Sequence, residues 1–305
     1  MSQYRKALPE NTDILCHGDG DGIISAAVLR KNGALGNVTL TQPFLIHKLP
    51  VLKNSTVIVD IAVDNKNPQA TIEWARANVA QILEWIDHHE GGELLKEVLG
   101  DKLIHDPTAP SCPDLIFKSG FEVPAEWVDA ANACDRPTDY KPTALSTRLN
   151  SAFKVALVEL QEGDKTIVDK VQKAQIEELA TGKLQTLVDE RVAQYTLLLK
   201  NTNMAVEGFK EVAPGIVATE LGTAKVDLTA LFNLGYKKAP VVVFQKLSPE
   251  TGEPISIVAT NRKDLNLVQT FGLKSGAPFR ITLTSSPELK DHEAQLAQVI
   301  KALSA

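Results

Sequence analysis

The chain of 305 residues is long enough for two domains, and its hydrophobic content of 44% is sufficient to fill a core in each. A formal net charge of −6 argues against a protein that coats nucleic acid through bulk positive charge, although it leaves a local basic groove open. The three cysteines have no CxxC spacing, which argues against a disulfide framework and against a zinc knuckle.

The first half of the chain alternates β-rich runs with helical stretches. We predict strands at 13–17, 38–41, 57–63, 81–86 and 103–105, and helices at 23–31, 68–78, 92–99, 113–119 and 124–133. Apolar strands that alternate with helices favour a mostly parallel sheet with helices on both faces. In such sheets, ligands bind beyond the carboxyl ends of the strands.

The second half of the chain has a different pattern. Residues 164–203 are rich in good helix formers and predict a helical connector, which Gly182 interrupts or bends. Residues 204–305 predict a smaller α+β domain, with strands within 206–221 and at 241–247, 255–260 and 281–284, and helices at 225–234, 264–271 and 288–303. The predicted fold class is therefore α/β, with a parallel-sheet domain over 1–163, the connector, and the smaller domain.

A polar motif, HGDGDG at 17–22, stands between the apolar run 14–16 and the helical pattern that begins at Ile23. Alternate residues of an extended segment point to the same side, so His17, Asp19 and Asp21 project together if the strand geometry persists. One imidazole and two carboxylates that converge in this way form part of a site for a hard metal ion. The alternative is a Gly-Asp turn that caps the following helix.

Three further acidic or histidine features follow predicted elements. Asp60 follows a buried-strand pattern, the Asp-His-His triplet 87–89 follows another, and Asp135 follows a helix-like stretch. Asp60 could instead cap a turn, and Asp135 could be an ordinary surface acid, whereas two adjacent histidines after a buried strand are harder to explain structurally. A pair of divalent ions needs a bridging carboxylate and ligands on each side. Carboxylate and imidazole ligands together suit manganese or magnesium, with zinc or cobalt possible.

Taken in order, these motifs resemble those of the DHH phosphoesterase superfamily, which includes RecJ-like and oligoribonuclease-like proteins. The HxDxDG motif is matched at 17–22, the second motif by Asp60, the name-giving triplet by 87–89 and the fourth motif by Asp135. The resemblance implies a two-metal site that hydrolyses phosphoester or phosphoanhydride bonds. Two Mn²⁺ ions are the implied cofactors, with Mg²⁺ or Co²⁺ possible.

The resemblance also implies a role for each site residue. His17 and Asp19 would hold one ion, Asp21, His88 and Asp135 the other, and Asp60 would bridge them; His89 would contact the scissile phosphate, and Asp87 would orient a histidine. Arg136 stands beside Asp135 and is a candidate phosphate contact close to the ions. Asp64 and Asp106 are weaker candidates for the outer shell.

The last third of the chain is similar to the smaller domain that follows in this superfamily and usually holds the far end of the substrate. Its candidate anion contacts are Arg262, Lys263, Lys274 and Arg280, each of which could equally be a solvated surface charge. The loop 272–276 reads GLKSG, where many relatives have Gly-Gly-Gly-His. The substrates of those relatives are therefore not carried over to this chain.

The expected activity is metal-dependent hydrolysis of phosphodiester or phosphomonoester bonds in short oligonucleotides or nucleotides, held between the two domains. An aromatic content of 5% argues against an extended base-stacking platform, and we expect no stable binding of long duplexes. One alternative is a phosphoanhydride hydrolase that acts on pyrophosphate or polyphosphate. Another is a catalytically silent, nucleic-acid-associated scaffold, which should have lost ligands.

The compartment and the absence of a membrane partner are predicted from two further observations. The first residues lack the apolar segment of a signal peptide, and no apolar run reaches membrane-spanning length. Together with the cysteine usage, this pattern favours a reducing cytoplasm.

Overall fold

The chain folds into two units, neither of which is continuous in sequence. The structure is a computed structural model that describes residues 8–161, 164–248, 251–273, 279–284, 286 and 288–303. Unit 1 comprises residues 1–153 and 166–192, and unit 2 comprises residues 154–165 and 193–305. Lys274, a predicted anion contact, and most of the 272–276 loop lie outside the described residues.

Unit 1 is built on a five-stranded sheet in which every neighbouring pair is parallel, in the order β2-β1-β3-β4-β5. The strands are β1 (Asp13–His17), β2 (Val38–Thr41), β3 (Thr56–Val59), β4 (Ile82–Asp87) and β5 (Leu103–His105). The predicted parallel sheet is confirmed. Strand β3 ends at Val59 and not at residue 63, because Asp60 has a φ of +58°, which an extended strand does not allow.

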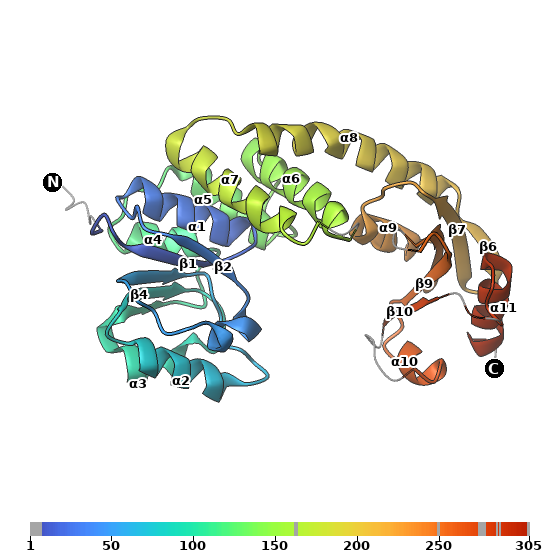
Figure 1. Ribbon diagram of the computed structural model, residues 1–305, viewed down its shortest axis with the longest axis horizontal. Helices are drawn as coiled ribbons and strands as arrows, with labels where there is room; N and C mark the ends of the chain where they lie inside the picture. Colours follow the sequence, from blue (N-terminus) through green and yellow to red (C-terminus); the bar gives the residue numbers. More distant parts are fainter. Residues whose placement is uncertain are drawn as a thin grey trace. The chain divides into compact units, whose positions relative to one another are not determined.

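Helices cover both faces of this sheet (Figure 1). One face carries α1 (Gly20–Lys31), α4 (Cys112–Lys118), α5 (Ala125–Asp135) and α7 (Ile167–Thr181), and the other carries α2 (Pro68–Asn78) and α3 (Lys96–Leu99), together with the 3-10 helices Pro43–Lys48 and Gly92–Leu95. Alternate strand residues point to opposite faces, so Ile14 and Cys16 pack on the α1 side and Leu15 packs on the α2 side. Residues 21–29 of α1 are all buried, because other helices surround it.

Unit 2 contains a second five-stranded sheet, in the order β10-β9-β8-β7-β6. The elements of this unit are β6 (Lys210–Ala213), β7 (Ile216–Gly222), α9 (Leu228–Gly235), β8 (Val241–Leu247), β9 (Pro254–Thr260), α10 (Leu267–Thr270), β10 (Arg280–Leu283) and α11 (His292–Leu303). Only β7 and β8 pair in parallel, so the described sheet is mixed. The α+β class predicted for this region is confirmed.

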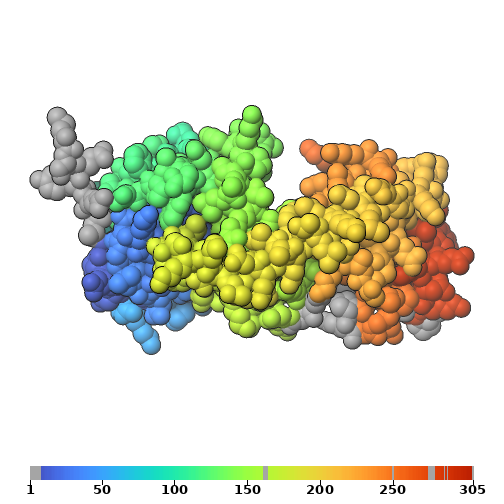
Figure 2. All heavy atoms as spheres, turned by 90° about the horizontal axis from the view of Figure 1, so that it is seen from above, coloured from blue at the N-terminus to red at the C-terminus, as the bar shows by residue number. Residues whose placement is uncertain are grey.

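Two long helices, α6 (Ala144–Gln161) and α8 (Thr186–Glu207), contribute residues to both units. Gly182 ends α7 in the left-handed conformation, with a φ of +69°, as its predicted role as an interruption requires. We did not predict α6, because its first half is rich in Ser and Thr, which have weak helix propensity. Figure 2 shows the exposed side of α8 in yellow. No helix among the described residues is long and apolar enough to span a membrane.

Arg148 on α6 ties together the three helices α6, α7 and α8. Its guanidinium donates to both carboxylate oxygens of Glu178, at 2.7 and 2.9 Å, and to Asp189 at 2.6 Å. Arg148→Lys is expected to lower the free energy of unfolding by about 1–3 kcal/mol, since lysine cannot reproduce the bidentate contact. Urea denaturation measures this loss. Lys118→Met, which removes an exposed pair with Asp114, is the control and should cost less than about 1 kcal/mol. Equal losses of stability in the two variants would contradict the role of Arg148 in linking the three helices.

Candidate metal centre

The predicted ligands meet at one edge of the parallel sheet in unit 1. His17 is the last residue of β1, Asp60 directly follows β3, and Asp87 is the last residue of β4. These three strands are neighbours, and because they are parallel their carboxyl ends lie at the same edge. The strand order alone therefore brings the first, second and third motifs together.

In the first motif, the extended backbone ends earlier than the sequence analysis assumed. Helix α1 begins at Gly20, so extended geometry does not persist to Asp21. Asp19 is the N-cap: its Oδ1 accepts from the backbone N–H of Gly22 at 3.0 Å, while its Oδ2 lies 2.8 Å from His17 Nδ1. The capping turn and the acidic cluster, which the sequence left as alternatives, are therefore the same structure.

Asp21 lies in the first turn of α1 and is fully buried. Its carboxylate accepts from the backbone N–H of Cys112 at 2.9 Å, at the start of α4. Gly22 follows it for a steric reason, because a Cβ at this position would lie 2.4 Å from the backbone oxygen of His17. The last glycine of the motif therefore permits the close approach of α1 to β1.

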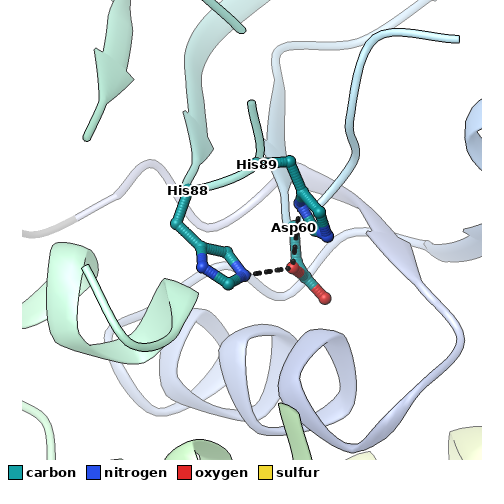
Figure 3. Close-up of side chains that lie close together, drawn as sticks. All are labelled: Asp60, His88 and His89. Atoms are coloured by element: carbon teal, nitrogen blue, oxygen red, sulfur yellow. Dashed lines mark ion pairs between the residues drawn. The ribbon is translucent and has the colours of Figure 1, made fainter. Parts of the chain in front are cut away.

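Asp60 is the centre of the cluster. Both of its carboxylate oxygens are buried and have no hydrogen-bond partner among the described residues. They lie 3.8 Å from His17 Nδ1, 3.5 Å from His88 Nε2 and 3.8 Å from His89 Nδ1. Figure 3 shows the two adjacent imidazoles pointing toward this carboxylate. Asp60 is also the one non-glycine residue with a positive φ in the described chain, a strained conformation of the kind that clusters at functional sites.

His88 presents a free ring nitrogen to the same cluster. Its Nδ1 lies 3.3 Å from the backbone oxygen of Ala109, to which it can donate. Its Nε2 is buried without a hydrogen-bond partner in the described structure and faces Asp21 at 3.3 Å, Asp60 at 3.5 Å and Asp135 at 4.0 Å. A histidine whose outer nitrogen is held by a carbonyl group, with its inner nitrogen left free, has the arrangement of a metal ligand.

Three overlapping groups of these side chains could each hold a metal ion. They are His17 with Asp19 and Asp60, then Asp21 with His88 and Asp135, and finally Asp60 with His88 and His89. All six predicted ligands belong to these groups. The donors are carboxylate oxygens and imidazole nitrogens with no thiolate, which fits Mn²⁺ or Mg²⁺. The buried atoms of Asp60 and His88 that have no partner support the same fit.

The electrostatics of the cluster favour a cation. Burial disfavours the charged form of His17 and His88, but the carboxylates that lie close to each ring outweigh it and raise the pKa of each imidazole to about 11. Burial raises the pKa of Asp60 well above its ordinary value, and the charges of Asp21 and Asp19 raise it further. The metal-free cluster therefore keeps its protons to limit repulsion between carboxylates, and divalent ions would replace those protons.

Metal binding is expected to release protons. His17 and His88 are protonated near neutral pH because the pKa of each is raised to about 11, whereas a metal ligand must be neutral. The apparent Mn²⁺ affinity should therefore rise between pH 6 and 9. Calorimetric titration in buffers of different ionisation enthalpy should report about one or two protons released per chain. His88→Gln should release about one fewer, and a binding enthalpy that is independent of buffer would contradict the expectation.

The predicted catalytic residues lie around this cluster. Asp87 is buried, and its Oδ1 lies 2.8 Å from Nδ1 of the partly exposed His89. Arg136 donates to the Ala109 backbone oxygen at 2.9 Å and lies 3.9 Å from a carboxylate oxygen of Asp135.

The two weaker candidates for the outer shell make local contacts. Asp64 Oδ1 accepts from the backbone N–H of Lys66 at 3.0 Å, and Asp106 Oδ1 accepts from the backbone and hydroxyl of Thr108. Neither carboxylate belongs to a group that could hold a metal ion within the described chain. Substitutions of these two carboxylates can therefore serve as controls for substitutions of the carboxylates in the cluster.

The predicted anion contacts belong to unit 2. Arg262 is paired with Asp264 at 2.7 Å. Lys263 is exposed, and the Arg280 guanidinium lies 5.8 Å from the centre of the Phe232 ring. Arg262 is therefore already partly neutralised by a neighbour.

Several partners of the cluster were missed from the sequence. Gln42 Oε1 lies 3.0 Å from His17 Nε2, and His105 Nε2 lies 2.7 Å from the backbone oxygen of His89. Gln42 directly follows β2 and His105 ends β5, so the rule that ligands gather at strand carboxyl ends could have found both. The backbone groups of Cys112 and Ala109 carry no such signal.

Known structures with similar folds were found, although no protein-family model and no curated protein matches the sequence. A pGpG-specific phosphodiesterase, PggH from Vibrio cholerae, is 16% identical with a TM-score of 0.58, covering 96% of this chain and 99% of the other. Exonuclease RecJ bound to manganese is 12% identical with a TM-score of 0.52, covering 96% and 90%. The chain has the fold of the DHH superfamily.

The DHH fold extends over nearly the whole chain and is not confined to the parallel sheet, since the coverage includes both units. The resemblance inferred from the four motifs is therefore confirmed at the level of the fold. The motif residues of the DHH pattern are also the residues that the fold brings together at the edge of the first sheet.

Proposed function

We propose that this protein is a two-metal phosphoesterase that hydrolyses phosphodiester or phosphomonoester bonds of short oligonucleotides or nucleotides, with Mn²⁺ as its preferred ion. The observation that carries this proposal is the set of three overlapping metal-capable groups, in which the group of Asp60, His88 and His89 shares Asp60 with one neighbouring group and His88 with the other. The DHH fold supports it, because a phosphodiesterase and an exonuclease have similar folds.

Each ligand has a proposed role. His17 and Asp19 would hold one ion, Asp21, His88 and Asp135 would hold the second, and Asp60, which has carboxylate oxygens near both groups, would be shared between them. When bound, two such ions lower the pKa of water and stabilise the charge that develops on phosphoryl oxygens. The strained backbone of Asp60 and the orphaned atoms of its carboxylate are consistent with a bridging role.

His89 is proposed as the proton donor. Its Nδ1 is engaged by Asp87 at 2.8 Å, which leaves Nε2 of this partly exposed ring available to a phosphate or to the leaving oxygen. Burial opposes the charged form of His89, but the hydrogen bond and charge of Asp87 outweigh it and raise its pKa. Asp87 thereby orients His89 and favours its protonated form. Arg136, anchored to a backbone carbonyl beside Asp135, is a proposed contact for the phosphate.

A short substrate is supported by the similarity to PggH, which is described as specific for pGpG. This similarity covers 96% of this chain and 99% of that enzyme. We therefore propose dinucleotides as the first substrates to test.

The test is hydrolysis by the full chain, with and without Mn²⁺, of pGpG, pApA, short RNA and DNA, bis-p-nitrophenyl phosphate, pyrophosphate and polyphosphate. We expect Mn²⁺-dependent conversion of at least one dinucleotide to mononucleotides, abolished by EDTA, with about two ions per chain by elemental analysis. No hydrolysis of any phosphoester, together with no bound metal, would overturn the proposal. Hydrolysis of pyrophosphate or polyphosphate alone would favour the phosphoanhydride alternative.

A further inference from the structure

A cavity of about 550 Å³ opens beside the metal centre, on the side of His89. Its wall comes from three segments that follow strands of the parallel sheet: residues 43–44, which begin the 3-10 helix after β2, residues 62–66 after β3, and residues 89–90 after β4. Its size lies within the range of small-molecule sites. Because His89 belongs both to the cavity wall and to a metal-capable group, a ligand whose phosphate lies at the metal centre can extend directly into it.

Phe44 supplies an exposed aromatic side chain to the wall of this cavity. Phe44 is 54% exposed, although large aromatic residues usually gain stability by burial. The backbone that carries it is held near the metal centre, because Gln42, two residues earlier, contacts His17 at 3.0 Å. An exposed ring on an anchored segment is suited to stack on a flat ligand, and every nucleobase offers a π-face for such stacking.

Residues 64–66 supply polar groups to the wall. Asp64 is 6% exposed and is held by a contact to the Lys66 backbone N–H, while the side chains of Asn65 and Lys66 are exposed. No ion pair of the Lys66 ammonium is found within the described part of the chain. The cavity therefore combines an aromatic face with an amide and a cation, as a nucleotide with a planar base and anionic phosphates requires.

We propose that this cavity is a nucleobase subsite, in which Phe44 stacks on the base of the nucleotide whose phosphate is held at the metal centre. The subsite rests on the proposed function, since it takes the substrate to be a nucleotide. It makes Phe44 a determinant of substrate binding, with no part in the chemical step.

The test compares the full-length wild type, Phe44→Ala and Phe44→Tyr, with Phe117→Ala as the matched control. Phe117 is 52% exposed on α4 and does not line this cavity. The first readout is quenching of a 2-aminopurine dinucleotide on binding in Ca²⁺ or Mn²⁺. The second is the kinetics of Mn²⁺-dependent cleavage of pApA and of the same phosphodiester without its bases.

We expect Phe44→Ala to lose the quenching and to raise KM for pApA roughly tenfold, with little change in kcat. Cleavage of the base-free phosphodiester should be unchanged. Phe44→Tyr should restore binding, since it keeps the ring, and Phe117→Ala should behave as the wild type.

The outcomes separate the subsite from the proposed function. If the wild type cleaves both phosphodiesters and Phe44→Ala does so with unchanged KM and quenching, the subsite is overturned and the phosphoesterase stands. If nothing is cleaved but quenching depends on the ring at position 44, the subsite stands and the phosphoesterase is overturned. If the wild type neither cleaves nor binds, both are overturned.

Discussion

Asp60→Asn is expected to reduce Mn²⁺-dependent hydrolysis by more than about 100-fold, because even residues outside the ligand shell cost 10–100-fold when they are changed. Asparagine is the informative replacement: it tolerates the left-handed backbone at this position and keeps the shape of the side chain. It cannot bridge two cations as a carboxylate does. Steady-state hydrolysis of a dinucleotide and metal content by elemental analysis measure the loss.

In the absence of metal, the free energy of unfolding of Asp60→Asn should be at least as large as that of the wild type. Burial and neighbouring carboxylates raise the pKa of Asp60, so the metal-free protein favours an uncharged group at this position, and the neutral amide meets that preference. At a Mn²⁺ concentration of about 100 times Kd, the wild type should gain about 2.7 kcal/mol, and Asp60→Asn should gain little. Asp106→Asn, which changes a carboxylate at the same sheet edge outside the metal-capable groups, should retain wild-type behaviour. If the two variants behave alike, Asp60 is not a ligand.

Gly22→Ala is expected to cost about 1–3 kcal/mol of stability and to reduce hydrolysis about 100-fold. The added Cβ would lie 2.4 Å from the His17 backbone oxygen and 3.1 Å from Asp60 Oδ2. Because the nearest atom is backbone, α1 or β1 must move, and both carry proposed ligands. Denaturant titration and metal-dependent hydrolysis measure the two effects.

Gly18→Ala is the matched control within the same motif. Its Cβ would lie 2.8 Å from Nε2 of Gln172, the far end of a side chain that can rotate. The expected loss is about 1 kcal/mol or less, from the hydrogen bond that Gln172 donates to the Gly18 backbone oxygen. A loss of activity as large as that of Gly22→Ala would mean that the motif is sensitive to any added side chain, and the specific steric argument would fail.

Much of the DHH fold could be predicted from the sequence, because the central strands of unit 1 are buried on both faces and appear as short apolar runs between helices. The limits of β1, β2 and β5 were predicted as observed. The end of β3 was not, since the left-handed backbone at Asp60 depends on the tertiary setting. Helix α6 was missed because packing, including the contacts of Arg148, overrides the weak propensity of its first half.

Part of the site could be predicted from the sequence, because the ends of the buried strands could be predicted. The side chains at those ends include His17, Asp60 and the triplet 87–89. Contacts of backbone groups cannot be inferred from residue types. The sequence therefore did not indicate that the N–H of Cys112 binds Asp21, or that the carbonyl of Ala109 orients His88. The same limit applies to Phe44, whose importance comes from exposure beside a cavity and not from any motif.

The interleaving of the two units along the chain determines how the protein can be cut for expression. A fragment that ends at residue 163 would lack α7, whose buried Val171 and Ile176 belong to unit 1, and would leave an apolar face of α1 open to aggregation. A fragment that ends near residue 192 keeps every residue of unit 1 and carries only residues 154–165 from the other unit. Isolating the candidate metal centre for spectroscopy therefore requires a boundary inside α8 and not before α7.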